Sequence, residues 1–222
     1  MSYILNIESS TTNCSISLSF DGKVISIKED NYEKYAHSNN LHSFIKYVLN
    51  ESNVSINELS AIAVSNGPGS YTGLRIGVAA AKGLCYALDI PLISISTLLV
   101  LAKQIKFIKD GLIIPVIDAR RNEVYSAVYD KSYNKIREVM PEIINEDSFS
   151  ELVSKNKLQF IGSGQEKCKR LMKTNPNLIF SSKIKFPSAN EMAFLSFEKF
   201  NNSKFEDIAY FEPDYLKNFI PG

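Results

Sequence analysis

The sequence contains few of the residues that bind metals or form disulfide frameworks. Its three cysteines, Cys14, Cys85 and Cys168, are odd in number, lie far apart and include no CxxC pair. This spacing argues against a disulfide framework or a cysteine zinc site and predicts reduced, buried thiols. The only histidines, His37 and His42, would stand about 140° apart around a helix, whereas imidazoles that share a metal must lie on one face. We therefore expect no metal site. We expect His37 to precede the first helix, and both histidines to lie at the surface or to cap a helix.

A charge excess and a long apolar run are also missing. The formal net charge of the 222 residues is +1, so the composition provides no basic surface for unaided nucleic-acid binding. Any contact with RNA is expected to be shared with a partner. The opening residues, MSYILNIESS, lack the features of a secretory signal, and no apolar run reaches membrane-spanning length. We expect a cytoplasmic protein with no membrane association.

What is present is an ordinary globular composition, 45% hydrophobic and 22% charged, with clear strand and helix patterns. Residues 14–20 alternate without a fault between apolar residues and serine, which is typical of a half-buried strand. Asp21-Gly22 is a favoured two-residue hairpin turn and leads into a strand over Val24–Ile27. Together with Tyr3–Ile7, these segments predict an opening three-stranded meander.

Similar patterns continue through both halves of the chain. Apolar residues from Leu41 to Leu49 recur at helical spacing and predict an amphipathic helix over about 39–51. The other expected helices are 73–88, 97–107, 147–154, one after Gly164 and one carrying Met192, Leu195, Phe197 and Phe200; the other expected strands are 61–65, 91–95, 112–118, 123–129, 136–144 and 158–161. Ser188 and Glu191 have capping-box spacing before the last helix. Because the halves repeat one order of elements, we expect two α/β lobes over 1–98 and 99–222, the final helix being able to pack on the first lobe.

The segment AIAVSNGPGSYTGLRIGVAAAKGLCYAL, residues 61–88, is the most informative part of the sequence. In it an apolar strand leads through a glycine loop into a helix rich in small residues. Glycines at 67, 69 and 73 permit close backbone approach, and the start of a helix offers unpaired N–H groups. The segment therefore predicts an anion site or a tight helix docking surface. Its spacing matches neither the GxGxxG fingerprint nor a P-loop.

Together with IDARRNEVY, this glycine segment resembles the signatures of the TsaB family, also called YeaZ. The resemblance extends over essentially the whole chain through Glu8-Ser9-Ser10-Thr11, His37-Ser38, Asp118-Ala119-Arg120-Arg121 and Pro213-Asp214-Tyr215-Leu216-Lys217. It implies an α/β fold of two tandem RNase H-like lobes, as in the superfamily of actin, sugar kinases and Hsp70.

The resemblance also implies a function. TsaB-family proteins are required, non-catalytic partners and activators of TsaD, a metal-bearing relative that forms threonylcarbamoyladenosine next to the anticodon of tRNAs reading codons that begin with adenine. A separate synthase supplies threonylcarbamoyl-adenylate, and the ATPase TsaE joins the complex. From this we expect TsaD as partner, TsaE through the complex, indirect contact with tRNA, and a homodimer when the chain is alone.

The residues themselves provide little chemistry. Catalytic members of the superfamily place an Asp and glycine loops around a nucleotide and its metal, but Glu8–Thr11 has no glycine and has Glu8 where the family more often has Asp. The turn at Asp118–Arg121 also lacks glycine. We expect no catalytic residues and no tightly bound cofactor, with ATP or ADP possible only within the complex. The alternatives are an autonomous nucleotide-dependent enzyme or a glycopeptidase-like hydrolase, but no GxSxG elbow is present.

The helix after the glycine loop carries the functional prediction. Gly73, Gly77 and Ala81 fall on one helical face, which could pack on the lobe's own sheet or admit a second helix. The residues leave both readings open, and the resemblance favours an interface through helices 41–51 and 73–88. On that reading, Gly77→Leu should block docking while leaving the fold largely intact. The predicted interface residues are His42, Lys46, Gly73, Arg75, Ile76, Gly77, Ala80, Ala81 and Leu84. Arg75 is expected to form a salt bridge, and Arg120 and Arg121 receive no role.

Overall fold

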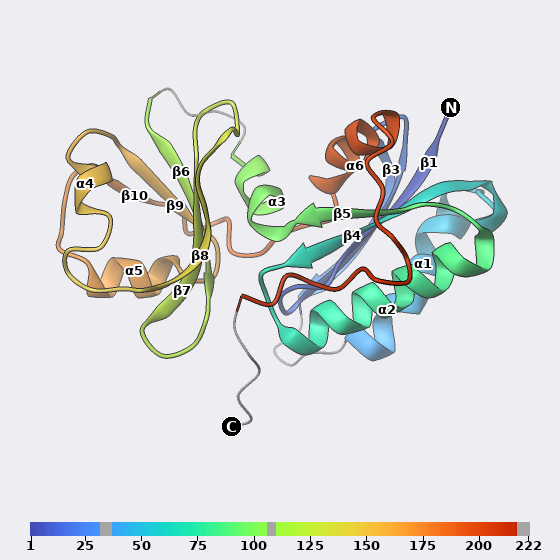
Figure 1. Cartoon of the computed structure of the whole chain (residues 1–222), viewed down its shortest axis with the longest axis horizontal. Coiled ribbons are helices and arrows are strands. Elements are labelled where there is room, and N and C mark those ends of the chain that lie inside the picture. Colours follow the sequence, from blue (N-terminus) through green and yellow to red (C-terminus); the bar gives the residue numbers. More distant parts are fainter. Residues whose placement is uncertain (32–36, 106–109, 217–222) are drawn as a thin grey trace. The chain divides into compact units, whose positions relative to one another are not determined.

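The computed structural model describes residues 1–31, 37–105 and 110–216, which divide into two compact units. The first unit consists of Met1–Val100 and Pro187–Tyr215, and the second of Leu101–Phe186 with Leu216. The division falls inside α3 (Thr97–Lys103), and residues 187–215 return to the first unit. Figure 1 shows the elements of both units along the chain. No helix in the described ranges is long and apolar enough to cross a membrane.

A five-stranded sheet in the order β3-β2-β1-β4-β5 forms the centre of the first unit. Its strands are β1 (Tyr3–Glu8), β2 (Asn13–Phe20), β3 (Lys23–Asn31), β4 (Leu59–Gly67) and β5 (Leu92–Ser96). The first three form an antiparallel meander, as the alternation predicts, and β4 pairs parallel with both β1 and β5. Asp21 and Gly22 both have positive φ, as a type I′ hairpin turn requires.

Helices cover both faces of this sheet (Figure 1). They are α1 (His37–Glu51), the short 3₁₀ helix η1 (Ile56–Glu58), α2 (Tyr71–Leu88) and α6 (Met192–Asn201). On one face, α1 and α2 pack side by side, and their apolar stripes bury residues such as Leu41 and Val78 against Ile62 of β4. On the other face, Met192 of α6 packs against residues of β1 and β5 such as Ile93.

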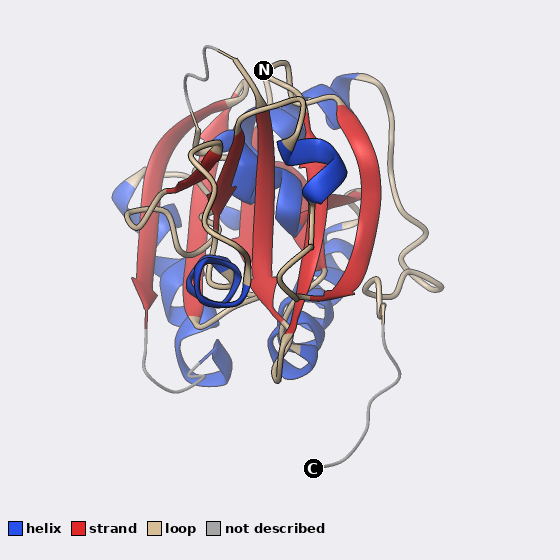
Figure 2. Ribbon diagram, turned by 90° about the vertical axis from the view of Figure 1, so that its left-hand side faces the viewer, coloured by secondary structure: helices blue, strands red, loops and turns tan. Residues whose placement is uncertain are grey.

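The second unit repeats this arrangement. Its elements are β6 (Leu112–Asp118), β7 (Glu123–Tyr129), β8 (Lys135–Ile143), α4 (Ser150–Val153), β9 (Leu158–Ile161), α5 (Gln165–Leu171) and β10 (Leu178–Phe180). The sheet order β10-β9-β6-β7-β8 again combines three antiparallel strands with two parallel ones, so the repeat predicted from the sequence is confirmed. Figure 2 shows short helices on the near face of this sheet. Between helices and sheet lies a core that includes Phe149, Phe160 and Cys168.

Several local predictions need correction. The first helix begins at His37 instead of after it, and the side chains of residues 37–39 lie outside the described part. The expected end of the third helix, at 107, also falls outside the described residues; α3 ends at Lys103. The capping box before α6 is wrong. Glu191 is itself the N-cap without a side-chain cap bond, and Ser188 Oγ instead donates to Glu29 Oε2 at 2.7 Å.

The cysteines agree with the sequence prediction. Cys14, Cys85 and Cys168 are buried free thiols. Burial raises the pKa of Cys14 to about 11 and the pKa values of Cys85 and Cys168 to about 12. These side chains therefore serve as small apolar core residues.

Candidate functional site

The loop between β4 and α2 lies directly against the chain's own first loop. A Cβ on Gly69 would lie 2.3 Å from the carbonyl oxygen of Ser10, so only glycine allows this approach. The same oxygen accepts a hydrogen bond from the Ser70 N–H at 2.6 Å. Ser70 Oγ in turn accepts from the Gly73 N–H at 3.2 Å and caps α2. The protein's own serines thus satisfy part of the helix start that the sequence offered as an anion site.

The small-residue strip of α2 faces the sheet of its own unit. Gly73, Gly77 and Ala81 are all buried. A Cβ on Gly77 would lie 2.2 Å from Ser9 Oγ and 3.5 Å from Ile7 Cγ2, and Ser9 Oγ donates to the carbonyl of Gly73 at 2.9 Å. The prediction that this strip faces a partner, and that Gly77→Leu leaves the fold intact, is therefore wrong. Glycine is required here because the end of β1 and the loop after it approach the helix closely.

The other predicted interface residues lie on or beside the outward faces of the two helices. They comprise the exposed residues His42, Lys46 and Arg75 and the half-buried residues Ile76, Ala80 and Leu84. The half-buried group packs against the core beneath α1 and α2. Two exposed small residues of α2, Ala79 and Gly83, were missed, and nothing lies within 4 Å of a Cβ placed on Gly83. The face of α2 that is open to a partner therefore carries Ala79 and Gly83 and lies opposite the strip of Gly73, Gly77 and Ala81.

A C-terminal segment that sequence reasoning did not place beside α2 lies across it (Figure 1). Lys82 Nζ donates to the carbonyl oxygens of Ala209 at 3.3 Å and Phe211 at 3.0 Å. At the glycine loop, the Asp214 N–H donates to Asn66 O at 2.8 Å, and Asn66 Nδ2 donates to Asp214 Oδ2 at 2.6 Å. We call residues 207–215 the C-terminal strap. The signature around Pro213 was the one signal that this segment has a fixed position.

Glu8, at the end of β1, is fully buried. Its Oε1 accepts hydrogen bonds from the N–H and Oγ–H of Ser10 at 2.7 and 2.5 Å, whereas Oε2 has no partner among the described residues. Burial raises the pKa of Glu8 from 4.5 to about 7, and the hydrogen bonds from Ser10 act in the opposite direction. The carboxyl group is thus enclosed by the protein and tied to the loop that contacts the start of α2.

In the second unit, Asp118 ends β6 as Glu8 ends β1. Lys167 Nζ lies 2.7 Å from Asp118 Oδ1 and donates to the carbonyl of Glu123 at 2.8 Å. The Lys167 side chain is buried. Sequence reasoning missed this pair because its members are 49 positions apart. Arg120 and Arg121 lie in the following exposed turn with positive φ.

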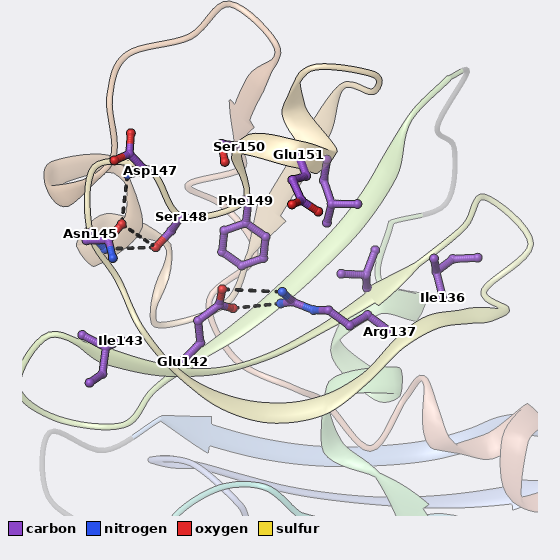
Figure 3. Close-up of a pocket in the computed structure, with 12 residues that line it drawn as sticks. Ile136, Arg137, Glu142, Ile143, Asn145, Asp147, Ser148, Phe149, Ser150 and Glu151 are labelled. Atoms are coloured by element: carbon purple, nitrogen blue, oxygen red, sulfur yellow. Dashed lines mark hydrogen bonds and ion pairs between the residues drawn. The ribbon is translucent and has the colours of Figure 1, made fainter.

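A pocket of about 620 Å³ in the second unit lies between β8 and residues 145–152 (Figure 3). Arg137 Nη2 lies 2.8 Å from Glu142 Oε2 and donates to Ser126 Oγ at 2.8 Å. The guanidinium carbon lies 4.7 Å from the centre of the Phe149 ring. A register shift between β7 and β8 brings the two charged side chains to one face. Glu142 and Ser126 already bind Nη1 and Nη2 of the guanidinium, whereas Nε has no partner among the described residues, so this cluster joins β8 to β7.

Two mixed sheets of the same strand order, each packed against helices, define a two-lobed α/β protein. The family model described as "TsaD: tRNA N6-adenosine threonylcarbamoyltransferase" matches residues 31–217. The chain belongs to the TsaB family, also called YeaZ, which confirms the resemblance seen in the sequence.

The individual relatives cover nearly the whole chain. The tRNA threonylcarbamoyladenosine biosynthesis protein TsaB of Bacillus subtilis is 33% identical over 96% of this chain and 93% of its own length. TsaB of Escherichia coli is 30% identical over 98% and 95%. Among solved structures, YeaZ from Pseudomonas aeruginosa has a TM-score of 0.81 at 24% identity and covers 97% of this chain and 100% of its own. A protein "with similarity to peptidase YEAZ" from the same organism has a TM-score of 0.84 at 23% identity, covering 98% and 100%. These two structures support the fold.

Proposed function

We propose that the chain is a required, non-catalytic partner and activator of a TsaD-type transferase, in the formation of threonylcarbamoyladenosine next to the anticodon of tRNAs reading codons that begin with adenine. Its relatives are named as threonylcarbamoyladenosine biosynthesis proteins. The transferase family's model also matches residues 31–217, so the chain and its proposed partner are related in sequence. That relation favours an assembly of two similar folds. TsaE joins it, tRNA is contacted indirectly, and the chain forms a homodimer when alone.

The observation that carries the non-catalytic role is that the protein's own groups already bind one oxygen of each carboxylate that ends β1 and β6. Magnesium sites need carboxylate oxygens that are free to coordinate the ion. Asp118 is held by the Lys167 ammonium at 2.7 Å, and Glu8 is fully buried with Ser10 bound to one oxygen. A magnesium ion at Asp118 would have to compete with the Lys167 ammonium, and an ion at Glu8 would have to break open the enclosure of that carboxyl group. We therefore propose that the chain alone binds no nucleotide tightly, and that ATP or ADP binds only within the complex.

The proposed docking surface is the outward face of α1 and α2. Exposed His42, Lys46 and Arg75 provide its polar part. Exposed Ala79 and Gly83 allow the backbone of a partner helix to approach α2 closely. An interface of standard size would remove roughly 800 Å² of surface from each partner.

Reconstitution tests the proposed function. Purified threonylcarbamoyl-adenylate synthase, TsaD and TsaE are combined with unmodified tRNA, with and without this chain, and the modified nucleoside is quantified by mass spectrometry. We expect modification only when the chain is present, and no nucleotide turnover or peptide hydrolysis by the chain alone. Full modification without the chain, or turnover by the chain alone that a single substitution abolishes, would contradict the proposal.

A further inference from the structure

The C-terminal strap is fixed to α2 near its start and to the end of β4 near its own end. Near its start, Lys82 Nζ binds the carbonyls of Ala209 and Phe211, and the half-buried Phe211 ring packs against the core below the helices. Near its end, Asp214 exchanges hydrogen bonds with Asn66 beside the glycine loop. These contacts connect the strap to the middle of α2 and to the end of β4, just before the glycine loop. The strap is therefore part of the same surface as the outward face of that helix.

The end of the strap forms an aromatic cluster around Arg75. The rings of Tyr215 and Tyr71 lie 5.0 Å apart. The guanidinium carbon of Arg75 lies 5.1 Å from the centre of the Tyr71 ring, and Nη1 donates to the Tyr71 hydroxyl at 2.9 Å. Burial raises the pKa of Tyr215, while the positive charge of Arg75 opposes that rise. Tyr215 thus supports the ring on which the guanidinium rests.

Arg75 lies in the second turn of α2, just beyond the helix start. No carboxylate forms an ion pair with it in the described part of the chain. The side chain is nevertheless held in place by Tyr71, so it would lose little conformational freedom on binding. A fixed, exposed guanidinium without an anionic partner is complementary to a carboxylate on another protein.

The strap also exposes residues of the type that dominate protein interfaces. The most exposed of these is Tyr210, at 85%. Tyrosine and arginine are enriched among the side chains whose truncation most weakens protein binding.

We propose that the C-terminal strap is a third element of the docking surface beside α1 and α2, and that Tyr215, acting through Tyr71, positions Arg75 for an acidic side chain of the TsaD-type partner. This inference rests on the proposed function. It identifies Tyr215 as a positioning residue and Arg75 as the residue that contacts the partner.

A double-mutant cycle tests the proposal. The affinity of the partner for the full chain is measured by isothermal titration calorimetry for wild type, Arg75→Gln, Tyr215→Leu and the double variant, at low and high salt. Each single substitution is expected to weaken binding about tenfold and to reduce its salt dependence. The double variant is expected to bind no more weakly than Arg75→Gln, because Tyr215 acts through Arg75.

Two further variants separate positioning from folding. Tyr215→Phe keeps the ring and is expected to retain wild-type affinity. Phe205→Leu removes another partly exposed ring of the first unit, outside the strap, and is expected to leave binding unchanged. Thermal unfolding of every variant establishes that it is folded.

The possible outcomes are distinguishable. Failure of the wild-type chain to bind the partner would contradict the proposed function itself. Normal binding by Tyr215→Leu would overturn the positioning role while leaving the proposed function intact. A double variant whose loss of affinity is the product of the two single losses would do the same, because the two side chains would then act independently. If Arg75→Gln lowers the affinity of the lone chain for tRNA and leaves partner affinity unchanged, Arg75 contacts phosphate and the inference is wrong.

Discussion

At the scale of single residues, Glu8 determines a pH dependence of stability. Its pKa is about 7 in the folded protein, against 4.5 for an unperturbed group, so the folded state binds a proton more tightly than the unfolded state. The resulting stabilisation is fully present below pH 4.5 and is lost as the pH rises through 7. A shift of this size corresponds to up to about 3 kcal/mol of unfolding free energy. Glu8→Gln, which cannot ionise, should remove this component of the pH dependence.

Urea unfolding between pH 4.5 and pH 8 measures the effect. The difference in unfolding free energy between Glu8→Gln and wild type should grow in favour of the variant as the pH rises. Glu51→Gln, at an exposed position at the end of α1, is the matched control and should keep the wild-type pH dependence. Equal pH dependence in the two variants would mean that Glu8 does not titrate in this range.

The sequence predicted some residue environments and missed others for one physical reason. The absence of paired spacing predicts free thiols, and the alternation over residues 14–20 places Cys14 on the apolar face of its strand; both are local properties. The contact between Lys167 and Asp118 joins positions 49 residues apart, and it exists only after α5 has packed against the end of β6. No local pattern marks Lys167 as a buried lysine. Likewise, the strand pattern that ends at Ile7 gives no sign that Glu8 is enclosed.

At the scale of elements, α2 has two small-residue faces with opposite roles. On the inner face, Gly77→Ala places its Cβ 2.2 Å from Ser9 Oγ, which should destabilise the protein by about 1–3 kcal/mol through overpacking. On the outer face, Gly83→Ala meets no atom within 4 Å and should stabilise the helix by about 0.5–1 kcal/mol. Thermal denaturation of the two variants measures both shifts. Equal shifts of the same sign would contradict the assignment of the two faces.

A larger side chain on the outer face of α2 separates folding from docking. Gly83→Leu should leave the unfolding temperature near that of wild type and weaken binding of the TsaD-type partner. Lys169→Leu, at an exposed position of α5 in the second unit, is the control and should bind normally. A folded Gly83→Leu variant with full affinity would remove the outer face of α2 from the docking surface.

Which face of α2 lies inward could not be read from the sequence. Leu41, Phe44 and Val48 give α1 one apolar stripe and a clear orientation, and the structure confirms it. In α2, small residues occur on both faces, so hydrophobic periodicity hardly distinguishes them. The inward face is set by the close approach of Ser9 to Gly77, a contact between segments far apart in the sequence.

At the scale of the whole molecule, the two units have one topology but differ in how the chain builds them. The repeated strand order was predictable because the order of local patterns repeats. The return of residues 187–215 to the first unit depends on tertiary contacts. It completes a face of the first sheet on which Ala189, Met192 and Leu195 pack.

Because segment 187–215 completes this face of the sheet, we predict that residues 1–100 do not fold alone. Segment 187–215 supplies the Ala189 carbonyl to Ser17 Oγ at 2.8 Å, and Ser196 Oγ donates to the buried Asn6 Oδ1 at 2.7 Å. Without this segment, these polar groups lose their partners and the apolar face of the sheet is exposed to water. Burial of the Met192 side chain alone contributes about 1.5–3 kcal/mol to the free energy of unfolding.

The measurement compares two polypeptides by circular dichroism during heating. Residues 1–100 should show no cooperative transition, whereas residues 1–100 joined through a flexible Gly/Ser linker to 187–215 should unfold cooperatively. In the joined polypeptide, Met192→Asp should abolish the transition, because it places a charge in the core under α6. Glu198→Gln on the same helix is the matched control. A cooperative transition of residues 1–100 alone, at the temperature of the joined form, would show that the returning segment is an accessory to the first unit instead of a part of its core.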